Sequence, residues 1–133
     1  MTPALRFATA RVARLATVTP AGTPHLVPIV FALVGDVLYS AVDGKPKRTR
    51  KLARLANIAA EPRVSVLADH YDEDWSLLWW VRADGVGRIV DESVAGLRAL
   101  TGRYPQYQES PPAGPFLEIT VERWTAWVSG RPG

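Results

Sequence analysis

Residues 12–42 read VARLATVTPAGTPHLVPIVFALVGDVLYSAV, and this stretch decides the fold. It contains three apolar runs of strand length, which are 12–18, 25–34 and 37–42. The runs are rich in β-branched and aromatic residues, and the segments that separate them have the composition of turns. Pro28 lies inside the second run and cannot donate a ladder hydrogen bond, so it indicates a sheet edge or a bulge. The stretch therefore predicts three consecutive strands joined by short turns.

Three further strands are predicted after this stretch, over residues 63–69, 77–91 and 116–128. The strand 77–91 is long, and we expect it to bend at Gly85 or Gly87. In the last strand, apolar and polar residues alternate. This alternation predicts one buried face formed by Leu117, Ile119 and Val121.

Helices are predicted over residues 3–10, 47–60 and 93–103, whereas residues 105–115 contain four prolines and predict a loop. Ser93 or Asp91 is expected to cap the third helix. Helical spacing predicts which side chains face inward. They are Leu5 and Ala8, with Phe7 as a further candidate, in the first helix, Leu52, Leu55, Ala56 and Ala59 in the second, and Leu97 and Leu100 in the third.

This order of elements predicts a mainly β fold, a small β-barrel of six to seven strands with flanking helices. The length favours one domain over residues 1–133. Several strands are apolar on both faces, and residues 26–34 and the pair Trp79-Trp80 are more apolar than an isolated barrel needs. A second copy of the chain is the simplest cover for such a face, so we expect a homodimer.

Composition excludes several classes of protein. The chain has no cysteine and two histidines, which rules out disulfides, thiolate metal sites and a cysteine nucleophile. His25 and His70 have no metal-ligand spacing, and the acidic residues 69–74 match no calcium loop, so we expect no metal site. No run approaches the roughly 18 apolar residues that span a bilayer, and no secretion signal precedes the first helix. We therefore expect a cytoplasmic protein without a membrane span.

Positive charge is concentrated in one segment at the start of the second predicted helix. Six of the 16 basic residues fall within ten positions that contain no acid, and they are Lys45, Lys47, Arg48, Arg50, Lys51 and Arg54. The remaining 123 residues carry ten basic against 13 acidic side chains. A helix start with such charge favours a local anion, although a solvated helix face is the alternative. Nucleic acid is not expected, because no aromatic residues interleave the basic run.

The ordered set of these features resembles a known family. The stretch ARLATVTPAGTPHLVPIVFALVGDVLYSAVDGKPKRTRKLARLANIAAEPRVSVL is similar to the flavin/deazaflavin oxidoreductases of the pyridoxamine 5′-phosphate oxidase-like superfamily. The later stretches LADHYDEDWSLLWWVRADGVGRI, RYPQY and ERWTAW resemble an actinobacterial subgroup of coenzyme F420-dependent enzymes. The resemblance covers residues 8–90 best. It implies an FMN-binding split β-barrel that forms a homodimer with cofactor sites at the subunit interface.

The resemblance also implies a function and a set of site residues. It implies that reduced F420 passes a hydride to a small organic acceptor, with FMN as the alternative cofactor. The residues that match by position, and would bind the cofactor, are His25, Val27, Pro28, Ile29, Ser40, Ala41, Val42, Lys45, Lys47, Arg48, Arg50, Lys51, Asn57, Trp79, Trp80 and Arg82.

No catalytic residue is assigned by the sequence. Tyr39, Tyr71 and Tyr104 are conceivable proton donors, and nothing in the sequence selects among them. The other class of function is a non-catalytic module that binds a flavin or a haem. Haem would need an axial ligand, for which His25 and His70 are the candidates.

Overall fold

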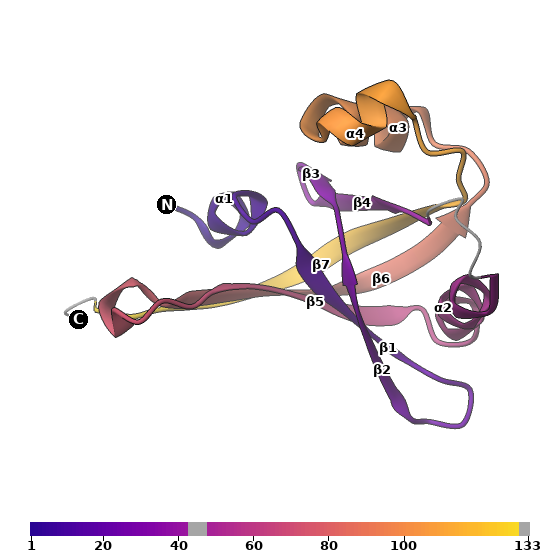
Figure 1. Ribbon diagram of the computed structural model, residues 1–133. Coiled ribbons are helices and arrows are strands. Elements are labelled where there is room, and N and C mark those ends of the chain that lie inside the picture. The colour runs from indigo at the N-terminus through magenta and orange to yellow at the C-terminus, as the bar shows by residue number, and fades with distance from the viewer. Residues whose placement is uncertain (43–47, 131–133) are drawn as a thin grey trace.

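Seven antiparallel strands form one sheet in the computed structural model, which describes residues 1–42 and 48–130 (Figure 1). The strand order is β2-β1-β5-β6-β7-β4-β3. The strands are β1 (Ala13–Val18), β2 (Pro24–Ile29), β3 (Ala32–Val34), β4 (Val37–Ala41), β5 (Arg63–His70), β6 (Trp79–Val90) and β7 (Phe116–Val128). The helices are α1 (Pro3–Ala8), α2 (Arg48–Ala60), α3 (Val94–Arg103) and α4 (Pro105–Glu109), with a short 3₁₀ turn η1 (Trp75–Leu77). The prediction of a mainly β fold with flanking helices is confirmed.

The predicted strand 25–34 is two strands, and the single-strand prediction was wrong. β2 ends at Ile29 and β3 begins at Ala32. Between them, the backbone N–H of Phe31 donates to the hydroxyl of Tyr104, 3.0 Å away, instead of to a neighbouring strand. β2 pairs only with β1 and lies at one end of the sheet, which is where Pro28 is tolerated.

The longest pairing, between β6 and β7, contains the predicted bend. Asp84 lies opposite Arg123 and Gly85 lies opposite Val121, so Glu122 is an extra residue on β7. A Cβ atom at Gly85 would collide with the backbone carbonyl of Thr120, which is why glycine is needed there. The bulge is at Gly85 and not at Gly87.

The main core fills the space on one side of this curved sheet. On β7, Leu117, Ile119 and Val121 are buried as predicted. After the extra residue the inward positions change from odd to even numbers, and Trp124 packs against Phe7 with ring centroids 5.3 Å apart. Phe7 is fully buried, whereas Leu5 is 60 % exposed, so the prediction that Leu5 faces inward was wrong.

Helices α2 and α3 also depart from the predicted faces. In α2, Ala56 and Ala59 are exposed, and the polar Asn57 is buried with Ile58 because Asn57 has a hydrogen-bond partner on β1. In α3, Leu100 is buried but Leu97 is exposed.

Ser93 caps α3, since its Oγ accepts from the N–H of Gly96 at 2.9 Å. The predicted loop 105–115 contains α4, because Pro105 occupies a first-turn position that needs no N–H. Helix α3, with α4 packed against it, lies over β3 and β4, while α2 lies against β6 and β1 (Figure 1).

Candidate functional site

The predicted residues of β2 divide between the two faces of the sheet. His25, Val27 and Ile29 lie opposite Thr17, Leu15 and Ala13 of β1, whose side chains are buried on the core side. Pro28 lies opposite Arg14 and is exposed on the other side. We call the side that carries Arg14, Leu26 and Pro28 the outer face.

The predicted residues at the end of β4 are buried and bonded within the fold. Ser40 is 2 % exposed, and its Oγ donates to the carbonyl of Val30 at 2.7 Å. The N–H of Val42 donates to the carbonyl of Pro115 at 2.9 Å, and Ala41 packs in a small core cluster with Leu100. The hydrogen bond that the Ser40 hydroxyl donates to Val30 therefore stabilises the turn between β2 and β3.

Helix α2 meets β1 and β2 at one end of the sheet. Asn57 is 3 % exposed, and its Nδ2 donates to the Oγ1 of Thr17 at 3.1 Å. His25 is the cross-strand neighbour of Thr17. The amide of Asn57 therefore fixes the last turns of α2 next to the β2 strand that carries His25.

Among the described residues, two nitrogen atoms in this region are buried without a hydrogen-bond partner, Nε of Arg54 and Nδ1 of His25. Arg54 lies one helical turn before Asn57. Burial lowers the pKa of Arg54, and no carboxylate of the described residues acts against this effect. We call the group Thr17, His25, Arg54 and Asn57 the α2 site.

The sequence counted Arg54 in the basic segment but did not assign it to the site. Its three-residue spacing from Asn57 is the signal that could have found it. Lys45 and Lys47 lie outside the described residues, as do the side chains of Arg48, Arg50 and Lys51. Helix α2 begins at Arg48, so the basic segment coincides with a helix start, as predicted.

The outer face carries a groove of about 600 Å³ across β2, β1, β5 and β6. Trp80 and Arg82 line it together with Leu26 and Leu67. The Nε of Arg82 lies 3.1 Å from a carboxylate oxygen of Asp84. A partly exposed apolar surface with paired charges at its edge is typical of an interface that another molecule covers.

Trp79 does not share this groove with Trp80. Neighbouring residues of a strand point to opposite faces, and Trp79 points to the core side. There its ring stacks on His70 at 6.4 Å, and the guanidinium of Arg6 lies 5.8 Å from the ring centroid. Within one chain, Thr17 therefore links His25 to Asn57, with Arg54 one helical turn away, on the core side, whereas Trp80 and Arg82 line the groove on the outer face.

The three tyrosines proposed as proton donors lie in different surroundings. The hydroxyl of Tyr104 forms hydrogen bonds with the backbone of Phe31 and Arg11, so its proton is already donated to backbone carbonyls within the fold. Tyr39 is 8 % exposed and Tyr71 is 73 % exposed. Within residues 1–42 and 48–130, no cluster of three or more His, Asp or Glu side chains could hold a metal ion. No helix in the same ranges is long and apolar enough to cross a membrane.

Comparison with known proteins identifies a family and a fold. The family described as pyridoxamine 5′-phosphate oxidase matches residues 2–128. None of the curated proteins matches the chain.

Three solved structures illustrate the likeness in fold. A FAD-binding protein from Mesorhizobium loti is 22 % identical, with a TM-score of 0.64 over 90 % of this chain and 87 % of its own. The conserved hypothetical protein Rv2991 from Mycobacterium tuberculosis is 24 % identical, with a TM-score of 0.66 over 96 % and 85 %. HutZ, a haem storage protein from Vibrio cholerae, is 15 % identical, with a TM-score of 0.67 over 96 % and 92 %. At these identities the likeness establishes the fold.

Proposed function

Because this chain belongs to the pyridoxamine 5′-phosphate oxidase family, we propose that it binds a planar redox cofactor with acidic groups at the α2 site. The cofactor that we propose is coenzyme F420, and the reaction is reduction of a small organic acceptor. When bound, reduced F420 supplies the hydride, and the protein holds and orients it. FMN is the alternative cofactor.

The observation that carries this proposal is the Nε of Arg54, which is buried without a hydrogen-bond partner among the described residues. A partly buried charge without a counter-ion is unfavourable, and an anionic group bound beside it would offset that loss. A guanidinium can hold phosphate or carboxylate through two parallel hydrogen bonds. Arg54 and the unpartnered Nδ1 of His25 thus fit a cofactor that brings negative charge to this end of the sheet.

The number of basic residues favours F420 over FMN. F420 carries a phosphate and several carboxylates on its tail, whereas FMN carries one phosphate. Six basic residues within ten positions offer more charge than one phosphate requires. In this proposal the basic segment holds the acidic tail, and Val27 and Ile29 give an apolar strand to the ring.

The homodimer is part of the same proposal. Leu26 is 66 % exposed and Trp127 is 46 % exposed on the outer face, and a second copy would cover both. A second copy also offers a way for Trp80 and Arg82 of one chain to serve the site of the other. Replacement of Leu26 by aspartate should give a monomer by light scattering with unchanged circular dichroism. A monomeric wild-type chain would contradict this part.

Titration of the purified chain with F420 and with FMN tests the choice of cofactor. A ligand at 100 times its Kd stabilises the folded state by about 2.7 kcal/mol, which a thermal unfolding experiment detects easily. We expect clear stabilisation by F420, and a fall in its affinity as salt rises. Stabilisation by FMN alone would assign the site to a flavin, and stabilisation by neither would contradict the proposal.

Haem binding is the second candidate, and the unpartnered Nδ1 of His25 is the observation that favours it. A neutral imidazole nitrogen is a common axial ligand of haem iron. Addition of haemin should then give a Soret band that the change His25→Ala removes. The same band in both proteins, or no band, would exclude His25 as the haem ligand.

A further inference from the structure

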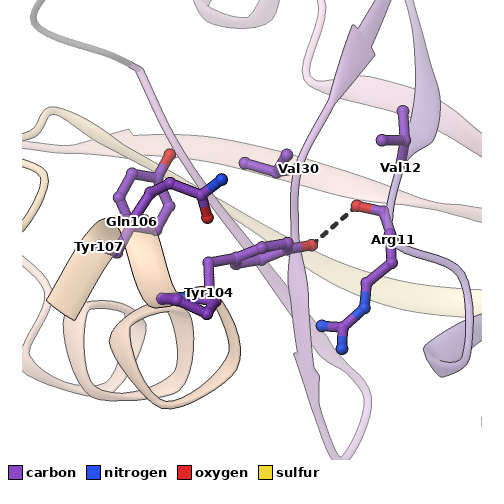
Figure 2. Close-up of a pocket in the computed structure, with 7 residues that line it drawn as sticks. Arg11, Val12, Val30, Tyr104, Gln106 and Tyr107 are labelled. Atoms are coloured by element: carbon purple, nitrogen blue, oxygen red, sulfur yellow. Dashed lines mark hydrogen bonds between the residues drawn. The ribbon is translucent and has the colours of Figure 1, made fainter.

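A second cavity, of about 540 Å³, lies between the start of β1 and helix α4 (Figure 2). Figure 2 shows Arg11 and Val12 on the strand side, Gln106 and Tyr107 on the helix side, and Val30 between them. Val12 directly precedes β1 and lies five residues before Thr17 of that strand, which in extended chain separates the cavity from the α2 site by about 17 Å. The volume is within the range of small-molecule sites, roughly 300–1,000 Å³.

Two arginines meet beside this cavity without a carboxylate. Arg103 donates to the backbone carbonyls of Phe31, Ala8 and Ala10. Arg11 donates to the carbonyl of Arg103 at 3.3 Å. In the described part of the chain, neither guanidinium forms an ion pair.

The positive charges of these arginines act on each other. Burial is the main cause that lowers the pKa of Arg103; Tyr104 acts in the opposite direction, and the nearby charge of Arg11 lowers the pKa further. Arg103 donates three hydrogen bonds to carbonyls, whereas Arg11 is exposed and its guanidinium donates one. Arg11 is therefore the cation that can take an anion at the mouth of the cavity.

The rest of the lining is aromatic and aliphatic. Tyr104 and Tyr107 are each 8 % exposed, and their rings meet edge to face with centroids 5.9 Å apart. Val12, Val30 and Pro105 complete the apolar lining, and the exposed Gln106 adds an amide. Such a surface suits a flat apolar ring, because aromatic rings prefer edge-to-face or offset contacts.

We propose that this cavity is a second ligand site, separate from the α2 site, that binds a small aromatic carboxylate. Arg11 holds the carboxylate through its planar guanidinium, while the ring lies against Tyr107, Val12 and Val30. The site is formed within one chain and needs no bound cofactor. Its failure would leave the proposed function untouched.

Titration of the cofactor-free full chain with 2-naphthoate tests the site, with amide NMR shifts as the readout. We expect the shifts to be largest at Val12, Val30 and Tyr107. The neutral analogue 2-naphthamide should bind in the same place more weakly. Shifts confined to the groove lined by Leu67 and Trp80 would overturn the proposal.

Two variants and a matched control make the test specific. The change Arg11→Gln should weaken 2-naphthoate at least tenfold and leave 2-naphthamide unchanged, whereas Arg98→Gln, an exposed arginine on α3, should alter neither. The change Gln106→Trp should block both probes by filling the mouth. Equal loss of both probes in Arg11→Gln would overturn the role of the charge. Competition of F420 or FMN with 2-naphthoate would overturn the assignment of a separate site.

Discussion

The corner around Arg103 and the α2 site around Arg54 each contain a partly buried arginine, and the two are used differently. Arg103 donates to three backbone carbonyls, and its guanidinium lies 4.5 Å from the ring centroid of Phe31. Arg54 leaves its Nε buried with no partner. Burial lowers the pKa of both groups, so desolvation alone does not distinguish them.

The difference lies in what the surrounding backbone offers. At Arg103, the carbonyls of α1, of the residues after it and of the β2–β3 turn converge on one guanidinium, so the charge holds three segments together. At Arg54, within the part of the chain that the structure describes, no carboxylate raises the pKa and no group accepts a hydrogen bond from Nε. A charge bonded by the fold stabilises the fold, and a charge left open is free for a ligand.

The largest expected effect is that of Arg103→Leu. The change removes three charge-assisted hydrogen bonds and leaves buried carbonyls unpaired, so the free energy of unfolding should fall by about 3–4 kcal/mol. Urea unfolding measures this, and Arg98→Leu on the same helix is the control. A loss below about 1 kcal/mol would show that Arg103 does not fasten this corner.

The next effect concerns the bond that holds α2 in place. Asn57→Ala leaves Thr17 without its buried partner, and the free energy of unfolding should fall by about 2 kcal/mol. Thr17→Val breaks the same bond from the other side. The double variant should lose less than the sum of the two, with a coupling energy above about 0.5 kcal/mol. Strict additivity would mean that the two side chains do not depend on each other.

Arg54→Met should have a much smaller effect on stability than Arg103→Leu. Methionine keeps most of the apolar stem and removes an unpaired charge, so the free energy of unfolding should change by less than about 1 kcal/mol, in either direction. The measurement is urea unfolding of the cofactor-free protein. A loss as large as that of Arg103→Leu would erase the contrast between the two regions.

The smallest effect is expected for a fully solvated arginine, Arg63. A side-chain hydrogen bond from Arg63 holds the pKa of Glu61 below its usual value. A carboxylate whose pKa is lowered in the folded state stabilises the fold at neutral pH. This contribution is lost as the pH falls through that lowered pKa. Arg63→Gln should therefore cause a barely detectable loss at pH 7, and none well below about pH 4. A pH-independent loss would contradict this origin.

Local sequence was sufficient for most strands and helices, because glycine and proline turns bound them. The break between β2 and β3 was not predictable, since it depends on Tyr104, 73 residues away from Phe31. The inward face of α2 was missed for the same reason, because Asn57 is buried by a bond to Thr17, 40 residues earlier. Both errors come from partners distant in sequence.

The candidate site was predictable in part. Strand alternation alone could have placed Trp79 and Trp80 on opposite faces. The unpartnered Nε of Arg54 could not be found from the sequence pattern, because the lack of a hydrogen-bond partner is a property of the folded chain. The basic segment of the sequence predicted where α2 starts. The structure then added Arg54, one helical turn before Asn57, to the candidate site.

The affinity of the chain for F420, measured by titration calorimetry, tests the central claim most directly when wild type, Arg54→Gln and Arg98→Gln are compared. Both variants lose one positive charge, so the net charge of the protein falls equally. The account predicts at least tenfold weaker binding, about 1.4 kcal/mol, for Arg54→Gln and wild-type affinity for Arg98→Gln. Equal affinity in all three proteins, or an equal loss in both variants, would contradict it.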